Sequence, residues 1–322
     1  MMSLERLRAL HAIATYGSVR AAADALQVTT SAISQQMAKL ETELGERMLD
    51  RNGRGVRLTD AAVRLVKHAD RIMSVVAEAE ADLEAHRGSV VGRLTLGAFP
   101  TAARGLAPRA LAALRTPHPD VQVALSELEP EEGVPLVTRG DLDLLIVQDW
   151  FNAPLTVSEG LVKSPLLDDL ADLALPADHA LADHPVIDLR DVAHEPWISW
   201  NRRSICHDWL ILTLRSQGVE PTIAHHAGEQ QTQLALVAAG LGLAVLPRLG
   251  RGQLPDGVRV VPVRPALSRH VYAIWRADAA RRPAIRAAIE ALRTAAASLA
   301  PRLAPATVAR RRAAGGARQP RA

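Results

Sequence analysis

The chain has 322 residues, of which 48% are hydrophobic, so it is long enough for more than one compact domain with its own core. Its 38 basic and 35 acidic side chains give a formal net charge of only +3, so any affinity for a nucleic acid depends on where the charges lie. The lone cysteine, the charged N-terminus and the lack of a run of ~20 apolar residues exclude a disulfide-bonded, secreted or membrane-spanning protein and predict a reduced, cytoplasmic one.

Residues 1–58 predict three short helices followed by a hairpin. Apolar residues recur with helical spacing over Leu4–Thr15, Ser18–Leu26 and Thr30–Leu44, with turn signals between these segments. In the third helix, an apolar stripe faces one way and a polar surface without acidic side chains faces the other. The stripe consists of Ile33, Met37, Leu40 and Leu44. A basic, glycine-containing hairpin at residues 51–58 completes the segment.

Two helices joined by a tight turn, the second with a polar outer face, form the geometry that places a recognition helix in the major groove of DNA. Hydroxyl groups near the start of that helix can contact phosphates or bases, and a glutamine amide can bind adenine N6 and N7 together. Gln35 is the prime candidate for base readout, and the hairpin arginines suit phosphate oxygens or the minor groove. The candidate DNA-binding residues are Ser18, Thr29, Thr30, Ser31, Ser34, Gln35, Lys39, Arg51, Arg54 and Arg57.

Residues 59–88 predict one long helix that begins after a Thr59-Asp60 cap. Its apolar residues are spaced alternately four and three apart, which is the seam of a coiled coil and implies a partner helix. The seam consists of Leu65, Ala69, Ile72, Val76, Ala79 and Leu83. The alternative is a helix that packs on its own domain.

From Arg93 onward, short apolar strands alternate with helices, which predicts α/β structure with a mostly parallel sheet. The pattern runs through Leu94–Gly97, Leu106–Leu114, Val121–Leu125 and Leu142–Val147, and resumes from Trp197–Trp200 to Leu243–Leu246, so two lobes are expected. Residues 301–322 are rich in Arg, Ala and Pro and contain no acid, which predicts a disordered tail. That tail is either a nonspecific nucleic-acid contact or a passive extension.

The ordered run of motifs in the first segment closely resembles the N-terminal signature of LysR-type transcriptional regulators. The matching residues are Ser18–Leu26, Ala32–Met37, Leu40-Glu41, Glu43–Gly45, Arg51, Gly53-Arg54 and Leu58-Thr59. The chain departs from the family's usual Ser-Gln-Pro at Thr29-Thr30-Ser31, and from its usual wing phenylalanine at Met48–Asp50. Base readout therefore rests more on Gln35 than on Thr30.

The second half resembles the effector domain of the same family through His118–Val121, Gly140–Leu144, Asp178-His179 and Leu236–Pro247. The resemblance implies an all-α winged helix-turn-helix domain at 1–58, a linker and dimerisation helix at 59–88, and a two-lobed α/β domain like periplasmic binding proteins at 89–300. Two crossing strands would join lobe I, about 89–164 and 265–300, to lobe II, about 165–264. The implied partners are double-stranded operator DNA, a small-molecule effector in the inter-lobe cleft, a second copy in a dimer or tetramer, and RNA polymerase.

Ligands of open α/β sheets bind beyond the carboxyl ends of the strands, where helix N-termini present free N–H groups. This rule selects the candidate effector-binding residues Pro100, Thr101, Ala102, Gln148, Asp149, Ser199, Trp200, Asn201, Glu229 and Gln230. Each of them could equally serve as a helix cap or make a loop hydrogen bond. A cleft of this kind suits a small carboxylate, whereas Asp149 and Glu229 would suit a cationic or hydroxylated ligand.

Two other classes of function remain as rivals, namely a DNA-packaging protein that uses the basic wing and tail, and an enzyme built on the cleft. No nucleophile elbow, phosphate-binding loop or catalytic carboxylate pair supports the enzyme. Cys206 is expected to be a small buried hydrophobe, and Trp197 a core residue. The histidines, including His225-His226, lack the spacing of metal ligands, so no metal or cofactor is expected.

Overall fold

The protein is represented by a computed structural model that describes residues 2–52, 55–86, 90–218 and 220–303. It divides into two compact units, Met1–Arg87 and Gly88–Ala322. Arg54, the side chain of Arg51 and the predicted tail from residue 304 onward lie outside the described residues. None of the described helices combines the length and apolar content that crossing a membrane requires.

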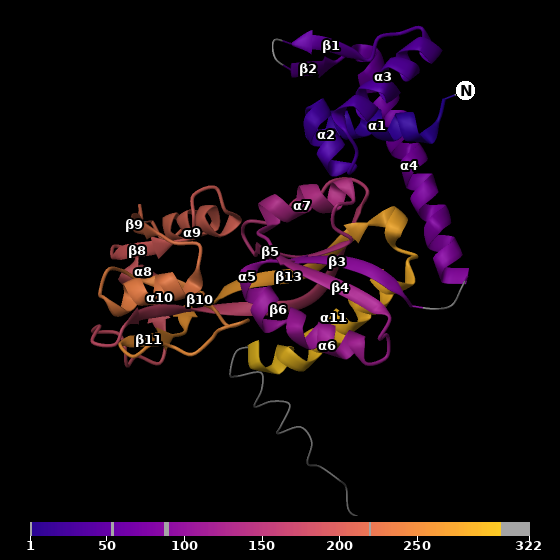
Figure 1. Cartoon of the computed structure of the whole chain (residues 1–322). Helices are drawn as coiled ribbons and strands as arrows, with labels where there is room; N and C mark the ends of the chain where they lie inside the picture. Colours follow the sequence, from indigo (N-terminus) through magenta and orange to yellow (C-terminus); the bar gives the residue numbers. More distant parts are fainter. Residues whose placement is uncertain (1, 53–54, 87–89, 219, 304–322) are drawn as a thin grey trace, which may run out of the picture. The chain divides into compact units, whose positions relative to one another are not determined.

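The first unit has the three predicted helices, a hairpin and a long helix (Figure 1). Hydroxyl side chains cap the first three helices, since Ser3, Ser18 and Thr29 each accept a backbone N–H three residues ahead. Leu10, Ile13 and other apolar residues of all three helices form one core. The elements are α1 (Leu4–Tyr16), α2 (Val19–Ala25), α3 (Thr30–Leu44), β1 (Leu49–Asn52), β2 (Gly55–Leu58) and α4 (Asp60–His86).

Helix α3 is held by its apolar stripe and by one polar contact to the hairpin. Ile33, Met37 and Leu40 are buried, but Leu44 is exposed, so the predicted stripe is one residue too long. The Glu41 carboxylate accepts the backbone N–H groups of Met48 at 2.7 Å and Leu49 at 3.2 Å. This contact fixes the start of the antiparallel β1–β2 hairpin against α3.

Helix α4 begins at the predicted cap, where Thr59 Oγ1 accepts the N–H of Ala62 at 3.1 Å. Its first predicted seam residue, Leu65, packs on the core of its own unit. Further along the helix, Ile72, Val75 and Leu83 are exposed, although Val75 was not among the seam residues. The exposed large apolar side chains of α4 therefore lie mainly on its later part, with Val63 exposed near its start.

The second unit is built on a mixed sheet, so the expectation of a mostly parallel sheet is wrong. Strands β4, β3 and β5 are parallel, but β13 runs antiparallel to both β5 and β6, and β10 and β11 run antiparallel to β6. The long strands β6 and β13 escape the simple strand-helix alternation because they return directly between the lobes. The strands of this sheet are β3 (Gly92–Ala98), β4 (Val121–Glu127), β5 (Leu144–Trp150), β6 (Leu161–Pro176), β10 (Ala244–Pro247), β11 (Val258–Val261) and β13 (Leu267–Arg276).

Helices cover both faces of the first lobe (Figure 1). The helices α5 (Pro100–Gly105), α6 (Ala107–Arg115) and α11 (Pro283–Leu303) pack on one face, and α7 (Pro130–Arg139) packs on the other. Helix α11 runs through Pro301, Arg302 and Leu303, which the sequence assigned to the disordered tail. The last turn forms because Leu303 is buried in the core together with Leu299, one turn earlier.

The second lobe surrounds the far end of β6. The pair β8 (Pro196–Ser199) and β9 (Thr222–His226) is parallel and lies with α9 (Ile205–Arg215), while α10 (Gln230–Ala238) packs near β10 and β11. The boundary expected at residues 164 and 165 falls inside β6, which therefore belongs to both lobes. The remaining elements are β7 (Ile187–Asp188), α8 (Leu189–Val192), β12 (Val263–Arg264) and the 3-10 turn η1 (Ala277–Ala279).

Candidate functional site

One face of α3 is exposed and polar. Ser31, Ser34, Gln35 and Lys39 recur three or four residues apart, so they share this face, and all four are exposed. Ser34 donates its hydroxyl to the carbonyl of Thr30 at 2.9 Å. Within the described part of the chain, no hydrogen bond is recorded for the Gln35 amide or the Lys39 ammonium, so both groups can bind an outside partner.

The predicted hydroxyl residues before α3 take structural positions. Ser18 caps α2 and Thr29 caps α3, where its Oγ1 accepts the N–H of Ala32 at 3.2 Å and lies 2.9 Å from Ser31 Oγ. Thr30 is the first residue of α3 and is exposed. A cap can still contact a phosphate, but the Ser18 and Thr29 hydroxyls already hold the starts of α2 and α3.

Arg57 is the hairpin arginine whose side chain the structure describes. It lies on β2, opposite Asp50 of β1 in the antiparallel register, and is exposed. The other hairpin arginines of the prediction, Arg51 and Arg54, have no described side chains. Arg57 is thus the described wing residue that can bind a phosphate.

A cavity of about 30 Å³ lies between the two lobes of the second unit. This volume holds no more than a few water molecules, so the two lobes are closed on each other. Residues of both lobes and of the crossing strand β13 line it. They are Phe99, Pro100, Thr101, Glu129, Gln148, Trp200, Gly228, Gln230, Gln233, Pro247 and Arg269.

Arg269 organises one wall of this cavity. Its guanidinium is buried and donates two hydrogen bonds to the buried Asp169 carboxylate, at 2.9 Å from Nε and 2.7 Å from Nη2. It also donates to Thr101 Oγ1 at 2.8 Å and to the Gln148 side-chain oxygen. The Asp169 charge balances that of Arg269, so the wall offers fixed hydrogen-bonding groups rather than a net charge.

The opposite wall comes from α10. The Gln230 side-chain oxygen accepts a hydrogen bond from Arg104 of the first lobe, and Arg104 Nε also donates to the carbonyl of Gly250 at 2.7 Å. The Gln230 Nε2 atom is buried and has no partner. A buried amide donor without an acceptor is costly, so this atom marks a place for an acceptor oxygen of a ligand or water.

Glu129 is the titratable group of the cavity. Burial and the nearby charge of Glu131 raise the pKa of its carboxyl to about 7. Arg269 acts against this rise. The Glu129 side chain can therefore donate or accept a proton near neutral pH.

Five of the ten predicted effector residues line the cavity, namely Pro100, Thr101, Gln148, Trp200 and Gln230. The other five, Ala102, Asp149, Ser199, Asn201 and Glu229, do not.

The first two of these five are committed to the interior of their lobe. Ala102 is buried in the core, and its N–H donates to the Phe99 carbonyl at 2.9 Å. Asp149 accepts Lys163 Nζ at 2.9 Å and the N–H of Leu155 at 3.1 Å. Gln148 and Asp149 lie inside β5, not after it, because both buried side chains have polar partners and the strand continues to Trp150.

The remaining three, Ser199, Asn201 and Glu229, contact other residues of the second lobe. Glu229 caps α10 by accepting the N–H groups of Gln231 at 2.9 Å and Thr232 at 2.6 Å. It therefore takes the role of a helix cap, which the sequence allowed as the alternative to effector binding. Burial disfavours its charge, but these bonds lower the pKa of the carboxyl. Ser199 is fully buried and bonded to His207, and Asn201 lies against Gly228.

The sequence did not single out Phe99, Glu129, Gly228, Gln233, Pro247 or Arg269. Glu129 could have been found, since it follows β4 as directly as Thr101 follows β3. Arg269 gave no such signal, because its partner Asp169 lies 100 residues earlier in the chain.

Cys206 is buried beside the cavity wall, as expected for a small hydrophobe. Gln148 Nε2 lies 3.3 Å and Trp150 Nε1 3.5 Å from its sulfur. Burial raises the pKa of the thiol to about 12. The thiol therefore stays protonated, and Trp197 is likewise fully buried, as predicted.

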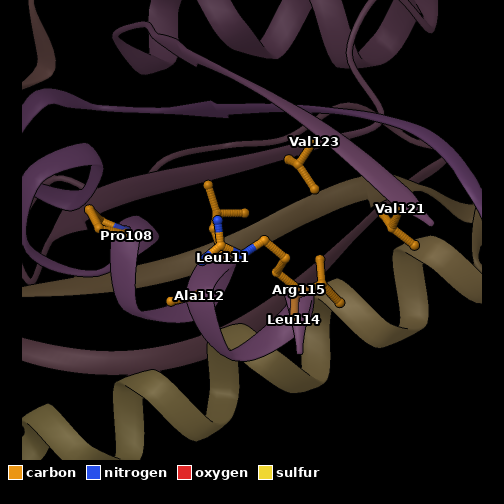
Figure 2. A pocket seen from close by; sticks show the side chains of 7 residues that line it. All are labelled: Pro108, Leu111, Ala112, Leu114, Arg115, Val121 and Val123. Carbon is orange, nitrogen blue, oxygen red and sulfur yellow. The ribbon is translucent and has the colours of Figure 1, made fainter. Parts of the chain in front are cut away.

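A second hollow of about 320 Å³ lies between α6 and the sheet-edge strand β4. Figure 2 shows its lining, with Leu111 and Arg115 on the helix below Val123 of the strand. Arg115 is the one charged side chain among the seven lining residues. This surface suits apolar packing rather than recognition of a polar effector.

Both units match known protein families. Residues 4–63 match the model described as the bacterial regulatory helix-turn-helix protein, lysR family, and residues 87–297 match the LysR substrate binding domain. The second match alone spans more than half of the chain.

Individual relatives agree over nearly the whole chain. The chain is 27% identical to the uncharacterized HTH-type transcriptional regulator YnfL of Escherichia coli K12, covering 88% of the chain and 96% of the relative. It is 27% identical to the DNA-binding transcriptional dual regulator OxyR of the same organism, covering 91% and 95%. The solved structure of full-length OxyR from Pseudomonas aeruginosa, at 24% identity, has the same fold, with a TM-score of 0.69 over 91% of this chain and 95% of that one. The chain therefore belongs to the LysR family of DNA-binding transcriptional regulators, with an N-terminal helix-turn-helix domain and a C-terminal effector-binding domain.

Proposed function

We propose that this regulator reads its operator through Gln35 and Lys39 of α3, and that Arg57 of the hairpin supplies a phosphate contact. The observation that carries the proposal is the exposed face of α3, where the Gln35 amide has no recorded partner in the described chain. A free amide at this place can bind adenine in the major groove, whereas the Ser34 hydroxyl already bonds within α3 and the Thr29 hydroxyl already caps it.

The experiment selects duplexes that the full chain binds from a pool of random sequence, and then footprints the chain on a selected site at physiological salt. A bounded, two-fold symmetric footprint supports sequence-specific binding by a dimer. Diffuse protection that disappears as salt rises would instead favour the DNA-packaging rival.

We also infer the residues that bind the effector. Thr101, Gln148, Gln230 and Arg269 supply the polar groups of the inter-lobe cavity, and Phe99 and Trp200 supply aromatic walls. The unpartnered Gln230 Nε2 requires an acceptor, so the effector presents an oxygen there. The carboxylates first considered for a cation, Asp149 and Glu229, are occupied elsewhere, and Glu129, which lines the cavity, can present a protonated carboxyl to a carboxylated or hydroxylated effector.

A ligand larger than a few waters cannot enter the closed cavity. We propose that effector binding changes the angle between the lobes, and that this change alters DNA binding and the access of RNA polymerase. We assign the cleft to binding without turnover, because among the described residues the Thr101 hydroxyl, which lines the cavity, is bonded to Arg269 and has no recorded hydrogen bond to a base such as Glu129.

Self-association is proposed to use the later part of α4, where Ile72, Val75 and Leu83 are exposed on one helix. The same helix of a second copy would cover them, in a dimer or in a dimer of dimers. Because a bacterial regulator of this family acts on the chromosome, the proposed location is the cytoplasm.

A further inference from the structure

A separate hollow of about 550 Å³ opens on the second lobe, and it shares no lining residue with the inter-lobe cavity. Its lining combines an apolar wall with basic and acidic side chains. The wall consists of Ile211, Leu212, Pro221 and Ile223, and the charged or polar residues are Arg202, His207, Asp208, Arg215, Glu220 and His226. The volume falls in the range that small organic ligands occupy, although charged and polar residues outnumber apolar ones in the lining.

Two imidazole rings, those of His207 and His226, line this hollow. His207 is held by Ser199, whose Oγ lies 2.8 Å from His207 Nδ1, and the ring centroids of His207 and His226 are 5.3 Å apart. The His226 Nε2 atom is buried and has no hydrogen-bond partner. Burial and the nearby charges of Arg202 and His207 lower the pKa of His226. His226 therefore stays neutral at physiological pH and can donate from a ring nitrogen.

The cationic group beside these rings is available. Arg202 is exposed, and no ion pair is recorded for it within residues 2–52, 55–86, 90–218 and 220–303. Arg215 is instead engaged with Glu220, at 2.6 Å between Nη2 and Oε1. Asp208 also lines the hollow and is exposed, and Arg202 exerts the largest charge effect among those that lower the pKa of His226.

We propose that this hollow is a second ligand site, which binds an organic anion with its carboxylate or phosphate group on Arg202, His207 and His226 and its apolar body on Ile211, Leu212 and Ile223. An anion there would give Arg202 a counter-charge and the buried His226 nitrogen a partner in one step. The apolar wall beside these groups explains why an organic anion fits better than a bare inorganic one.

The test is equilibrium dialysis of the full chain against radiolabelled benzoate, with inorganic phosphate as a competitor. We expect the wild type to retain benzoate, and Arg202→Gln and His226→Phe each to weaken binding by about tenfold. The matched control is Arg203→Gln, which removes the same charge from the exposed neighbouring residue that does not line the hollow. Arg203→Gln is expected to bind as the wild type does, and phosphate is expected to displace benzoate.

A second control, Gln230→Ala, separates this site from the inter-lobe cleft. Loss of benzoate in Gln230→Ala with no change in Arg202→Gln would place the probe in the cleft and overturn the proposal. No retention by the wild type, or equal weakening by Arg202→Gln and Arg203→Gln, would overturn it as well.

Discussion

Glu131 of α7 and Ile205 of α9 join the two lobes across the cleft, with the Glu131 carboxylate accepting the backbone N–H of Ile205 at 2.6 Å. Ile205 is the first residue of α9, so the carboxylate meets the positive end of that helix. The contact favours the closed arrangement of the lobes.

Replacement of Glu131 by Gln should loosen this closure, because a neutral acceptor binds a helix N-terminus more weakly than a carboxylate does. Hydrogen exchange of the peptide that contains Ile205 is expected to become faster in Glu131→Gln. The control is Glu132→Gln, the exposed neighbouring acid, which should exchange as the wild type does. Equal exchange rates in all three proteins would show that the contact does not hold the lobes.

The raised pKa of Glu129 implies that the stability of the protein depends on pH. Its pKa in the folded protein is raised to about 7, above its usual value of 4.5, so the folded state binds a proton that the unfolded state has lost at intermediate pH. The contribution of Glu129 to the free energy of unfolding is therefore greatest at low pH and falls as the pH rises from 4.5 to about 7. Urea unfolding of the wild type and Glu129→Gln across this range measures the difference. The variant should gain stability relative to the wild type as the pH rises, and a constant difference would contradict the assignment.

The buried pair of Arg269 and Asp169 predicts a large loss of stability when one partner is removed. Asp169→Asn leaves the Arg269 charge without its counter-charge and should lower the free energy of unfolding by about 3 to 5 kcal/mol. Asp168→Asn is the matched control, because Asp168 is exposed and pairs only with His270 in the recorded ion pairs. That control should cost less than about 1 kcal/mol in the same urea titration. Similar losses in the two variants would count against a special role for the buried pair.

A phosphate contact by Arg57 should contribute to the salt dependence of DNA binding. Each phosphate contact releases condensed counterions, so Arg57→Gln should reduce the slope of log affinity against log salt by about one unit and weaken binding to every sequence alike. Fluorescence anisotropy with labelled duplexes at several salt concentrations measures the slope. An unchanged slope would remove Arg57 from the phosphate contacts.

Local signals in the sequence were enough to predict the helices and caps of the first unit. The bounds of α3, Thr30–Leu44, follow from the Thr29 cap, the apolar stripe and Gly45, all of which lie within or next to the helix itself. The cap at Thr59 was found for the same reason. Burial of Leu65 against its own unit was missed, because a heptad pattern does not distinguish a partner helix from the rest of the same domain.

The cleft could be predicted only in part, because its contents depend on contacts between distant residues. The rule that ligands bind after strand ends found Thr101 and Gln230. The rule failed for Asp149, which lies inside β5 with its carboxylate paired to Lys163. It also failed for Glu229, whose carboxylate caps its own helix. The mixed sheet was also missed, since short apolar runs do not reveal the direction in which β13 pairs.

The most direct test of the account compares Gln35→Ala with the wild type on a selected operator and on random duplex DNA at the same salt. Gln36→Ala is the control, since Gln36 is the neighbouring, partly buried glutamine on a different side of α3. We expect Gln35→Ala to lose about 1 to 3 kcal/mol of binding free energy on the operator and almost none on random DNA, while Gln36→Ala keeps the specificity of the wild type. Equal losses on both DNAs in Gln35→Ala would contradict base readout by this residue.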